Sequence, residues 1–377
     1  MALTIETLTL PPAGPGTERR LTVLRYRSTQ PGPKAYVQAA VHADEVPALL
    51  VAQHLREKLT ALDAAGKLKG EIILVPYANP IGLTQFLQGW HLGRFELDSG
   101  QNFNRGYPEL FEAVASVIDG QLGADAASNI TIIRQALRAA LPTHLPVSEN
   151  AALKQHLYRL SCDADVVLDL HCDFEATMHL YIGTPLWAEG GADLAACMAS
   201  PVNLLADDSG GEAFDEANSR LWWQLAQRFP QHPIPPACFA ATIELRGDRD
   251  VDDALASKDA DGLIAFLASR DCIDLPTPPK PAIAPQATLL EAVDSLEASH
   301  PGVLTWTVKL GSTVQRGELL GHLVDPESGI RRPIHARNDG LFFAARGHRW
   351  VRPGQWIAKI AGCEKLDWRK AGALLSN

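Results

Sequence analysis

Residues 35–51 combine two patterns that together restrict the fold: an apolar, β-favouring run passes directly into the start of a helix. Residues 35–41 predict a buried strand, and leucines that recur near helical spacing from Leu49 onward predict the helix. His42 and Glu45 lie in the turn between the two elements. Such a turn can bring an imidazole and a carboxylate to one point, and both are ligand types that suit zinc. By itself, however, the four-residue pattern also fits a surface histidine and a glutamate at a helix start.

The first 270 residues alternate strand patterns with helical patterns. A strand, a helix and a second strand follow one another from residue 35 to residue 77, which predicts a parallel crossover. The apolar run at 71–77 is typical of a strand that is covered on both faces. We therefore expect an α/β fold in which a sheet is flanked by helices. Strands are predicted at residues 4–10, 21–26, 35–41, 71–77, 165–170, 179–183 and 238–245, and helices at 49–64, within 109–160, at 221–229 and at 251–269.

The composition changes after this region. Residues 275–285 carry five prolines and predict a semi-rigid connector. We place a domain boundary near residue 280, between a domain at 1–280 and a domain at 281–377. Short β patterns separated by glycines predict that the second domain is a small all-β barrel-sandwich. It resembles biotinyl/lipoyl-type domains, but residues 324–333, where such carriers present a modified lysine, contain no lysine, so we expect a structural module near the mouth of an active site.

Three more motifs bear on the turn at His42. A strand pattern ends at His171, and in open α/β sheets ligands bind outside the carboxyl ends of strands, where His42 also stands. Asn104 and Arg105 lie in a long irregular loop, and a guanidinium beside an amide matches a carboxylate. Glu244 ends an apolar strand, where desolvation raises the pKa of a carboxyl toward the range useful to a general base.

Each of these motifs also has a plain structural explanation. His171 fits a hydrogen-bonded core histidine, and Arg105 fits a loop arginine paired with a surface acid. Glu244 fits a structural salt bridge with Arg246. What is specific is the ordered set: H-x-x-E, then N-R, then a histidine and later a glutamate at the ends of strands.

This ordered set resembles the succinylglutamate desuccinylase/aspartoacylase family, in the zinc carboxypeptidase-like superfamily of M14 type. The resemblance covers about residues 35–250, and a β-rich C-terminal domain is also characteristic of the family. It implies a zinc-carboxypeptidase-like mixed sheet flanked by helices, with one zinc ion per chain. It also implies that the zinc ligands are His42, Glu45 and His171.

The resemblance also implies roles for the remaining residues. Glu244 would be the catalytic base, and Asn104 with Arg105 would hold the carboxylate of the substrate. Arg94, upstream in the same loop, would be a second carboxylate or oxyanion contact. Many relatives carry Asp at the position of Asn102, where a carboxylate orients a ligating imidazole; an amide does so less strongly.

These roles predict a zinc-dependent amidohydrolase of linear amides, a deacylase similar to succinylglutamate desuccinylase and aspartoacylase. Three protein ligands leave a fourth position open, as in catalytic zinc sites. The expected substrate is an N-acyl amino acid or a similar small N-acylated molecule, whose acyl group and amine the sequence does not identify. Two alternatives stay open: a metallocarboxypeptidase that acts on peptides, and a binding protein that keeps the fold without catalysis.

Composition limits the expected partners. The net charge is −10 and Lys and Arg form no block, so neither nucleic acid nor an anionic membrane is expected as a partner. The apolar runs are too short to span a bilayer, and the N-terminus lacks a signal-peptide pattern. Six cysteines show no C-x-x-C spacing, which favours reduced thiols and a cytoplasmic protein. Formation of a homo-oligomer is compatible with these properties and is not determined by them.

Overall fold

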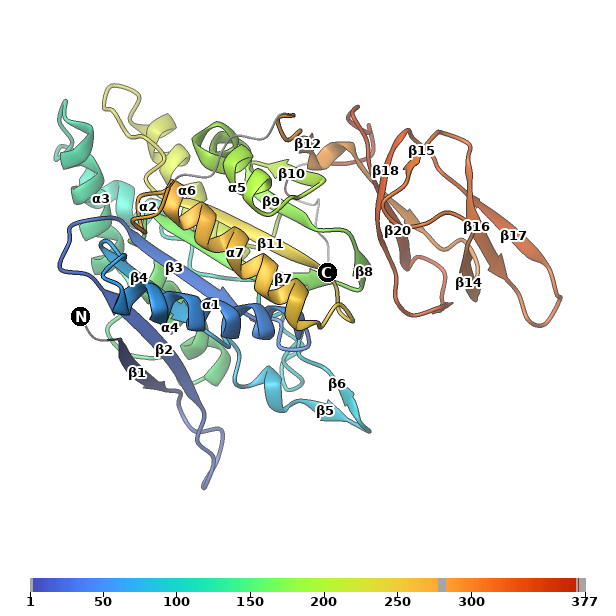
Figure 1. Cartoon of the computed structure of the whole chain (residues 1–377), viewed down its shortest axis with the longest axis horizontal. Helices are drawn as coiled ribbons and strands as arrows, with labels where there is room; N and C mark the ends of the chain where they lie inside the picture. The colour runs from blue at the N-terminus through green and yellow to red at the C-terminus, as the bar shows by residue number, and fades with distance from the viewer. Residues whose placement is uncertain (1–2, 277–282, 371, 373–377) are drawn as a thin grey trace.

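A nine-stranded mixed sheet forms the centre of the larger part of the molecule (Figure 1). The computed structural model describes residues 3–276, 283–370 and 372. In order across the sheet, the strands are β1 (Thr4–Thr9), β2 (Arg20–Arg27), β4 (Glu71–Val75), β3 (Lys34–Ala39), β7 (Val166–Asp173), β11 (Phe239–Gly247), β9 (His179–Gly183), β10 (Val202–Ala206) and β12 (Thr288–Leu289).

The four neighbouring strands β4, β3, β7 and β11 are parallel to one another. Strands β3 and β4 are joined through α1 (Pro47–Ala64), so the predicted parallel crossover is confirmed. Helix α1 begins at a proline, which suits a first helical turn because the missing N–H would have no partner there. Since parallel strands end at the same edge of a sheet, the segments at the ends of β3, β7 and β11 lie close together.

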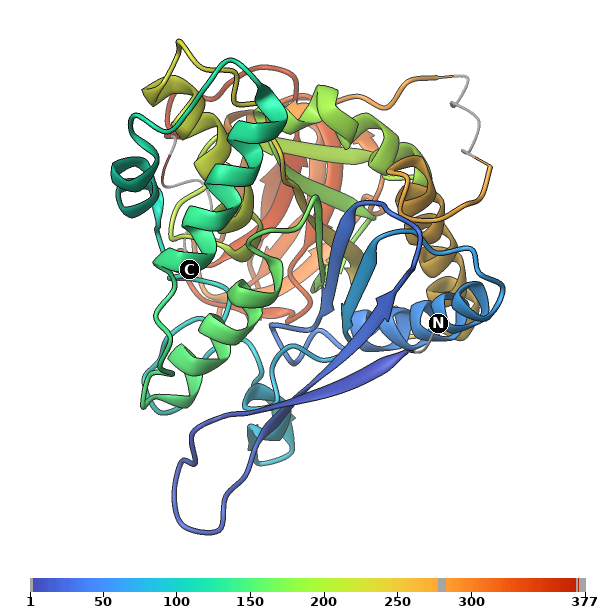
Figure 2. The same cartoon turned by 90° about the vertical axis from the view of Figure 1, so that its left-hand side faces the viewer.

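Helices cover both faces of the nine-stranded sheet (Figure 2). Besides α1 they are α2 (Phe111–Ile118), α3 (Ala126–Ala140), α4 (Glu149–Ser161), α5 (Ala192–Cys197), α6 (Phe214–Arg228) and α7 (Asp253–Ser269), with short helical turns η1 (Gly82–Thr84), η2 (Thr184–Leu186), η3 (Trp187–Gly191) and η4 (Leu290–Ala292). On one face α1 and α7 lie side by side, and their core includes Leu55 and Leu263. On the other face the core includes Leu157 and Trp222. In the part of the chain that the structure describes, no helix has the length and apolar content that a bilayer crossing needs.

Most predicted elements are present, and the differences have local causes. Strand β10 lies where no strand was predicted. Helix α6 begins earlier than predicted, because its first turn carries Asp215 and Glu216 rather than apolar residues at helical spacing. The irregular loop at 81–109 contains a small hairpin of β5 (Phe86–Leu87) and β6 (Trp90–His91).

The C-terminal part forms two further antiparallel sheets. One has the strand order β13 (Val293–Glu297), β20 (Trp356–Ala361), β18 (Gly340–Ala345) and β15 (Thr313–Val314); the other has β17 (Arg331–His335), β16 (Leu319–Val324), β14 (Gly302–Trp306) and β19 (Trp350–Val351). The predicted fold class, a mixed sheet flanked by helices and followed by a β-rich C-terminal part, is confirmed. The domain boundary predicted near residue 280 lies outside the described residues.

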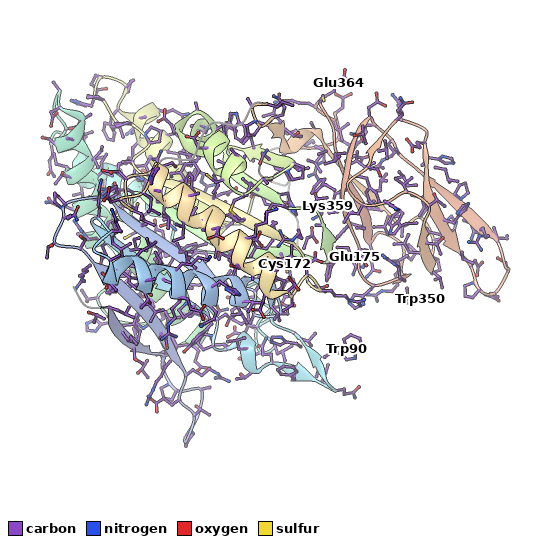
Figure 3. All side chains as sticks on the ribbon, in the orientation of Figure 1. Trp90, Cys172, Glu175, Trp350, Lys359 and Glu364 are labelled. Carbon is purple, nitrogen blue, oxygen red and sulfur yellow. The ribbon has the colours of Figure 1, made fainter. Side chains whose placement is uncertain are left out.

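The two parts contact each other through strand pairs and ion pairs. Strand β8 (Glu175–Ala176), which follows β7, pairs with β18 of the C-terminal part. Lys359 on β20 binds the carboxylate of Asp173 at 2.5 Å, and Arg349 binds the carboxylate of Glu175 at 2.7 Å. Figure 3 shows Lys359 between the C-terminal sheets and the segment that carries Cys172 and Glu175.

Replacing Lys359 with methionine is expected to destabilise the protein. The ion pair with Asp173 is largely buried, with 19% and 11% of the two side chains exposed. Loss of the cation leaves a buried carboxylate without its ion-pair partner, which costs about 3 kcal/mol. In a protein of this size that lowers the thermal midpoint by about 5 °C or more. The control is Lys365→Met, which breaks an exposed pair with Glu291 and should shift the midpoint very little; equal shifts in the two variants would contradict the prediction.

Candidate metal centre

Three neighbouring strands bring the predicted site residues to one edge of the sheet. His42 follows the end of β3, His171 lies near the end of β7, and Glu244 lies near the end of β11. In the sheet, Glu244 is the register partner of His171. Between β3 and His42 the backbone of Ala40 has a φ of 56°, in the left-handed region, which turns the chain away from the strand direction. The following turn is closed by the Glu45 N–H, which donates to the His42 carbonyl at 3.1 Å.

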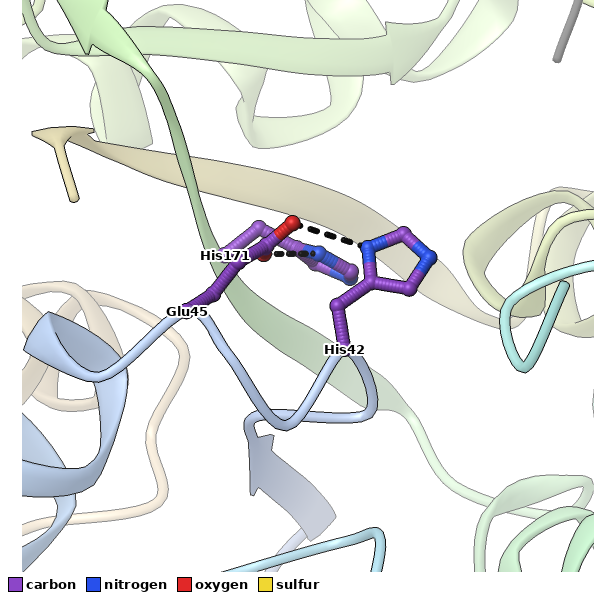
Figure 4. Close-up of side chains that lie close together, drawn as sticks. All are labelled: His42, Glu45 and His171. Carbon is purple, nitrogen blue, oxygen red and sulfur yellow. Dashed lines mark hydrogen bonds and ion pairs between the residues drawn. The ribbon is translucent and has the colours of Figure 1, made fainter. Parts of the chain in front are cut away.

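His42, Glu45 and His171 form a compact buried cluster (Figure 4). The Nδ1 atom of His42 lies 2.9 Å from Glu45 Oε1, and Nδ1 of His171 lies 2.7 Å from Glu45 Oε2. One donor atom from each of the three residues lies within 4.8 Å of the others. The three residues are 2%, 6% and 2% exposed, so their donor atoms are shielded from bulk water.

The outer nitrogen of each imidazole is held by an oxygen acceptor. His42 Nε2 donates to Asn102 Oδ1 at 2.8 Å, and His171 Nε2 donates to Asp169 Oδ2 at 3.0 Å. Asp169 is itself held by Gln38, whose Nε2 donates to Asp169 Oδ1 at 2.9 Å. Contacts of this kind fix the orientation of metal-binding imidazoles. Here they direct Nδ1 of both rings toward the same carboxylate.

The environment of His42 creates a place for a cation. Burial, together with the charge of Arg94, lowers the pKa of His42 to about 4, so the ring is neutral near pH 7. Because Nε2 carries the hydrogen donated to Asn102, Nδ1 is an acceptor, and it faces a second acceptor in Glu45 Oε1. In the structure Arg94 Nη1 lies 3.0 Å from Glu45 Oε1 and 3.3 Å from His42 Nδ1. Two acceptors that face one point fit a bound metal ion.

The pKa values of His171 and Glu45 also favour a cation at this point. Burial alone would lower the pKa of His171, but the carboxylates of Asp169 and Glu45 outweigh it and hold that pKa well above its usual range. Burial alone would raise the pKa of Glu45, but His171 and His42 outweigh it and hold that pKa well below its usual range. A metal cation can take the place of a proton held in this way, as metal binding generally releases protons from its ligands. Two imidazole nitrogens and a carboxylate oxygen are a donor set found in catalytic zinc sites.

Glu244 lines the same cavity, and within the described residues it forms no salt bridge. Burial, followed by the charge of Glu45, raises the pKa of Glu244 to about 8. Its Oε2 is buried and has no hydrogen-bond partner among the described residues. Arg246, the neighbour that a structural salt bridge would require, instead pairs with Asp259 on α7. The structure therefore places beside the cluster a buried carboxyl that has no ion-pair partner among the described residues.

Asn104 and Arg105 lie on another wall of this cavity. Asn104 Oδ1 accepts the Phe214 N–H at 3.0 Å, and its Nδ2 lies 3.2 Å from His171 Nε2, so this amide contacts both α6 and the cluster. Arg105 Nη1 donates to the Asn104 carbonyl at 2.7 Å. Within the described residues no carboxylate lies at ion-pair distance from Arg105, which excludes a loop arginine paired with a surface acid.

The cavity has a volume of about 1020 Å³ and reaches from the cluster to the C-terminal sheets. None of the lining residues from those sheets was predicted. Arg346, Trp356 and Lys359 all line the cavity. Lys359 is a lysine inside the apolar run of β20, which is a signal that the sequence offered. The sequence did not indicate which cavity its side chain would reach.

Gly93 allows the loop that carries Arg94 to lie against the cluster. A Cβ at Gly93 would lie 2.2 Å from the backbone nitrogen of Asp44, and the Gly93 carbonyl accepts the Ala43 N–H at 3.0 Å. Gly93→Ala is therefore expected to displace the cluster and weaken metal binding by at least about tenfold, the size of effect that displaced supporting groups produce. Metal content after dialysis measures this. Gly123→Ala, whose Cβ would meet nothing within 4 Å, is the control, and equal metal retention in both variants would contradict the prediction.

Comparisons with known proteins agree with this architecture. The model of the succinylglutamate desuccinylase/aspartoacylase catalytic domain matches residues 31–270. A succinylglutamate desuccinylase/aspartoacylase family protein from Shewanella amazonensis has a similar structure, with a TM-score of 0.83 and 26% identity over 95% of this chain and 98% of that chain. A second such protein, from Shewanella frigidimarina, has a TM-score of 0.85 and 24% identity, covering 96% of this chain and 97% of that chain. A search of curated proteins found no match.

A third structure shows how far the fold extends beyond close sequence similarity. The succinylglutamate desuccinylase/aspartoacylase from Rhodobacter sphaeroides has a TM-score of 0.68 and 16% identity, over 96% of this chain and 95% of that chain. Because these alignments cover almost the whole chain, the similarity includes the C-terminal sheets as well as the larger part.

Proposed function

The chain belongs to the succinylglutamate desuccinylase/aspartoacylase family, and on that premise we propose that it is a zinc-dependent deacylase. In this proposal it hydrolyses the amide bond of an N-acyl amino acid or a similar small N-acylated molecule. The observation that supports this most is the convergence of His42 Nδ1, His171 Nδ1 and the Glu45 carboxylate on one point. Those three residues would hold the zinc ion, and when bound it supplies Lewis-acid chemistry that polarises the scissile carbonyl.

Glu244 is the general base of the proposed reaction. Its buried Oε2 has no partner among the described residues and can accept a proton from the attacking water. The same carboxyl then gives the proton to the leaving nitrogen, which must be protonated before the C–N bond breaks. A group in this role has to gain and lose a proton in each cycle, and a pKa raised toward neutrality by burial suits that requirement.

Three further residues bind and stabilise the substrate in this proposal. Arg105, which has no carboxylate partner among the described residues, binds the carboxylate on the amine side of the substrate. Asn104 positions this arginine through its backbone carbonyl and contributes its side-chain amide to the same wall. The guanidinium of Arg94 reaches the cluster and stabilises the negative charge that develops on the carbonyl oxygen.

The alternative is a metallocarboxypeptidase that acts on peptides with the same cluster. The C-terminal sheets favour the deacylase, because they place Arg346, Trp356 and Lys359 in the wall of the cavity. A wall at this position encloses a small molecule, whereas a peptide needs an open groove on both sides of the cleaved bond.

Removal of the metal is expected to abolish amide hydrolysis. A chelator strong enough to strip zinc should reduce turnover of N-acyl amino acids to background, and added zinc should restore it, because none of the protein groups replaces the Lewis acid. The assay uses a panel of N-acyl amino acids beside dipeptides with a free carboxyl terminus. Turnover that survives complete metal removal would contradict the proposed chemistry, and faster turnover of the dipeptides would favour the carboxypeptidase.

A further inference from the structure

The first turn of α6 carries two acidic side chains in the cavity that the proposed mechanism does not use. We propose that Asp215 and Glu216 form a subsite for a cationic group on the amine half of the substrate. This inference rests on the proposed function and adds a chemical class to it: the amine that is released is a diamino acid whose second amino group is a free ammonium ion. The two acids are then specificity-determining residues.

Both acids are buried and line the cavity. Asp215 is 7% exposed and Glu216 is 8% exposed, and Ser219, one turn further along α6, lines the cavity beside them. An acid in the first turn of a helix is favourable at the surface, as at the exposed Glu112 of α2. Burial of two neighbouring carboxyls is costly unless a cation or hydrogen-bond donors compensate for it. Their position in the cavity wall therefore points to a ligand.

No cation among the described residues lies at ion-pair distance from these two acids. Arg220, on the same helix, instead binds Asp208 at 3.0 Å and Glu212 at 2.8 Å. The Ser209 N–H donates to Glu216 Oε1 at 2.7 Å, which holds this carboxyl in place. Its Oε2 is buried and has no hydrogen-bond partner in the part of the chain that the structure describes. One oxygen of a fixed, buried carboxyl is therefore available to a ligand.

The two acids lie on the same wall of the cavity as Arg105. The Gly106 N–H donates to the Gly211 carbonyl at 2.8 Å, which ties the loop of Arg105 to the segment that leads into α6. A Cβ at Gly211 would lie only 2.7 Å from Arg105 Cδ, so the arginine stem packs against this segment. The N–H of Phe214, the first residue of α6, donates to Asn104 Oδ1 at 3.0 Å. If Arg105 holds the carboxylate on the amine side of the substrate, the cation belongs to that side as well.

An ammonium ion fits these acids better than a guanidinium. Because the Ser209 N–H occupies one oxygen of Glu216, this carboxyl does not offer the two parallel oxygens that match the fork of an arginine. An ammonium is a compact charge with three donors, which can reach one oxygen of each acid. Burial, followed by the charge of Glu216, raises the pKa of Asp215 to about 7, and a bound ammonium would hold this carboxyl in its ionised form.

The test compares two substrates that differ only at the end of the side chain. These are an Nα-acyl ornithine and the corresponding Nα-acyl norleucine, in which a methyl group replaces the terminal ammonium; both carry the acyl group of the best substrate in the panel. The wild-type enzyme is expected to prefer the ornithine derivative by about tenfold or more in kcat/KM, the effect of one charge-assisted hydrogen bond. Asp215→Asn should remove most of that preference through KM, and Asp215→Glu should keep part of it.

The matched control is Glu112→Gln, which removes an acid from the first turn of another helix, at an exposed residue that does not line the cavity. It should leave the preference unchanged. Glu216→Gln is a second variant that should lower the preference as Asp215→Asn does, so the test still decides if one of the two does not fold. An absent preference in the wild-type enzyme, or equal losses on both substrates in these variants with zinc content and thermal midpoint retained, would overturn the proposal.

Direct binding separates this proposal from the proposed function. Calorimetry of the zinc-loaded protein with free ornithine and free norleucine measures the subsite without turnover. Tighter binding of ornithine than of norleucine by the wild-type protein, with the difference lost in Asp215→Asn, supports the subsite even if no N-acyl substrate is hydrolysed. Equal binding of the two amino acids by the wild-type protein overturns it even if the enzyme is an active deacylase.

Discussion

Glu244→Gln is expected to lower kcat by about 10²- to 10⁴-fold, the contribution that a positioned general base typically makes. Glutamine has nearly the same shape as glutamate but cannot take the proton of the attacking water or return it to the leaving nitrogen. Because Glu244 is not one of the three proposed ligands, zinc content should stay at about one ion per chain. Turnover is measured with the best substrate of the N-acyl panel, and zinc by elemental analysis.

The pH dependence of Glu244 provides a second measurement on the same variant. Only the ionised carboxylate can accept a proton from water. The value of kcat/KM should therefore rise with pH as the Glu244 carboxyl loses its proton. Burial and Glu45 raise the pKa of Glu244 to about 8, whereas the charge of a bound zinc ion would lower it. The midpoint of the acid limb, the part of the profile where kcat/KM rises with pH, should therefore lie at or below about 8. This limb should be missing from the residual activity of Glu244→Gln. Glu364→Gln, at an exposed residue, is the control; a full rate in Glu244→Gln would remove this residue from its role.

His171→Ala is expected to abolish both zinc binding and activity. The variant removes one of three converging donors. Only Glu45 and His42 then remain as ligands, which are too few to retain zinc at ordinary concentrations. Zinc content should fall from about one ion per chain to nearly none. His300→Ala, at an exposed histidine, should retain the full content. Retention of zinc by His171→Ala would show that the cluster is not the metal site.

Asp169→Asn provides a graded comparison. Among the described residues, the Asp169 carboxylate forms hydrogen bonds with the outer nitrogen of the His171 ring and with the Gln38 amide. Its replacement should leave zinc binding in place but weaken it by about 10- to 100-fold, as removal of a supporting contact commonly does. A larger loss of zinc affinity in His171→Ala than in Asp169→Asn distinguishes a ligand from a residue that orients a ligand.

Much of the larger part of the molecule could be predicted because its elements have clear local patterns. Strands β3, β7 and β11 are apolar runs, and α1 and α7 repeat apolar residues at helical spacing, so their types followed from periodicity alone. Strand β10 was missed because Asn203 interrupts its apolar run, and the first turn of α6 was missed because it is polar. The proposed pair Glu244–Arg246 failed as an explanation because Arg246 reaches across to Asp259 on α7, a contact that sequence distance conceals.

The sequence by itself determined the local half of the candidate site: His42 and Glu45 are three positions apart in one turn, so their side chains can meet there. Only the tertiary structure decided which distant groups complete it. His171 and Glu244 meet this turn because β3, β7 and β11 are hydrogen-bonded neighbours. Arg346 lines the same cavity because β18 pairs with β8, the short strand that follows β7. The physical reason is that periodicity within a segment reports which face of it is apolar, whereas the choice of neighbouring strand depends on the packing of the whole chain.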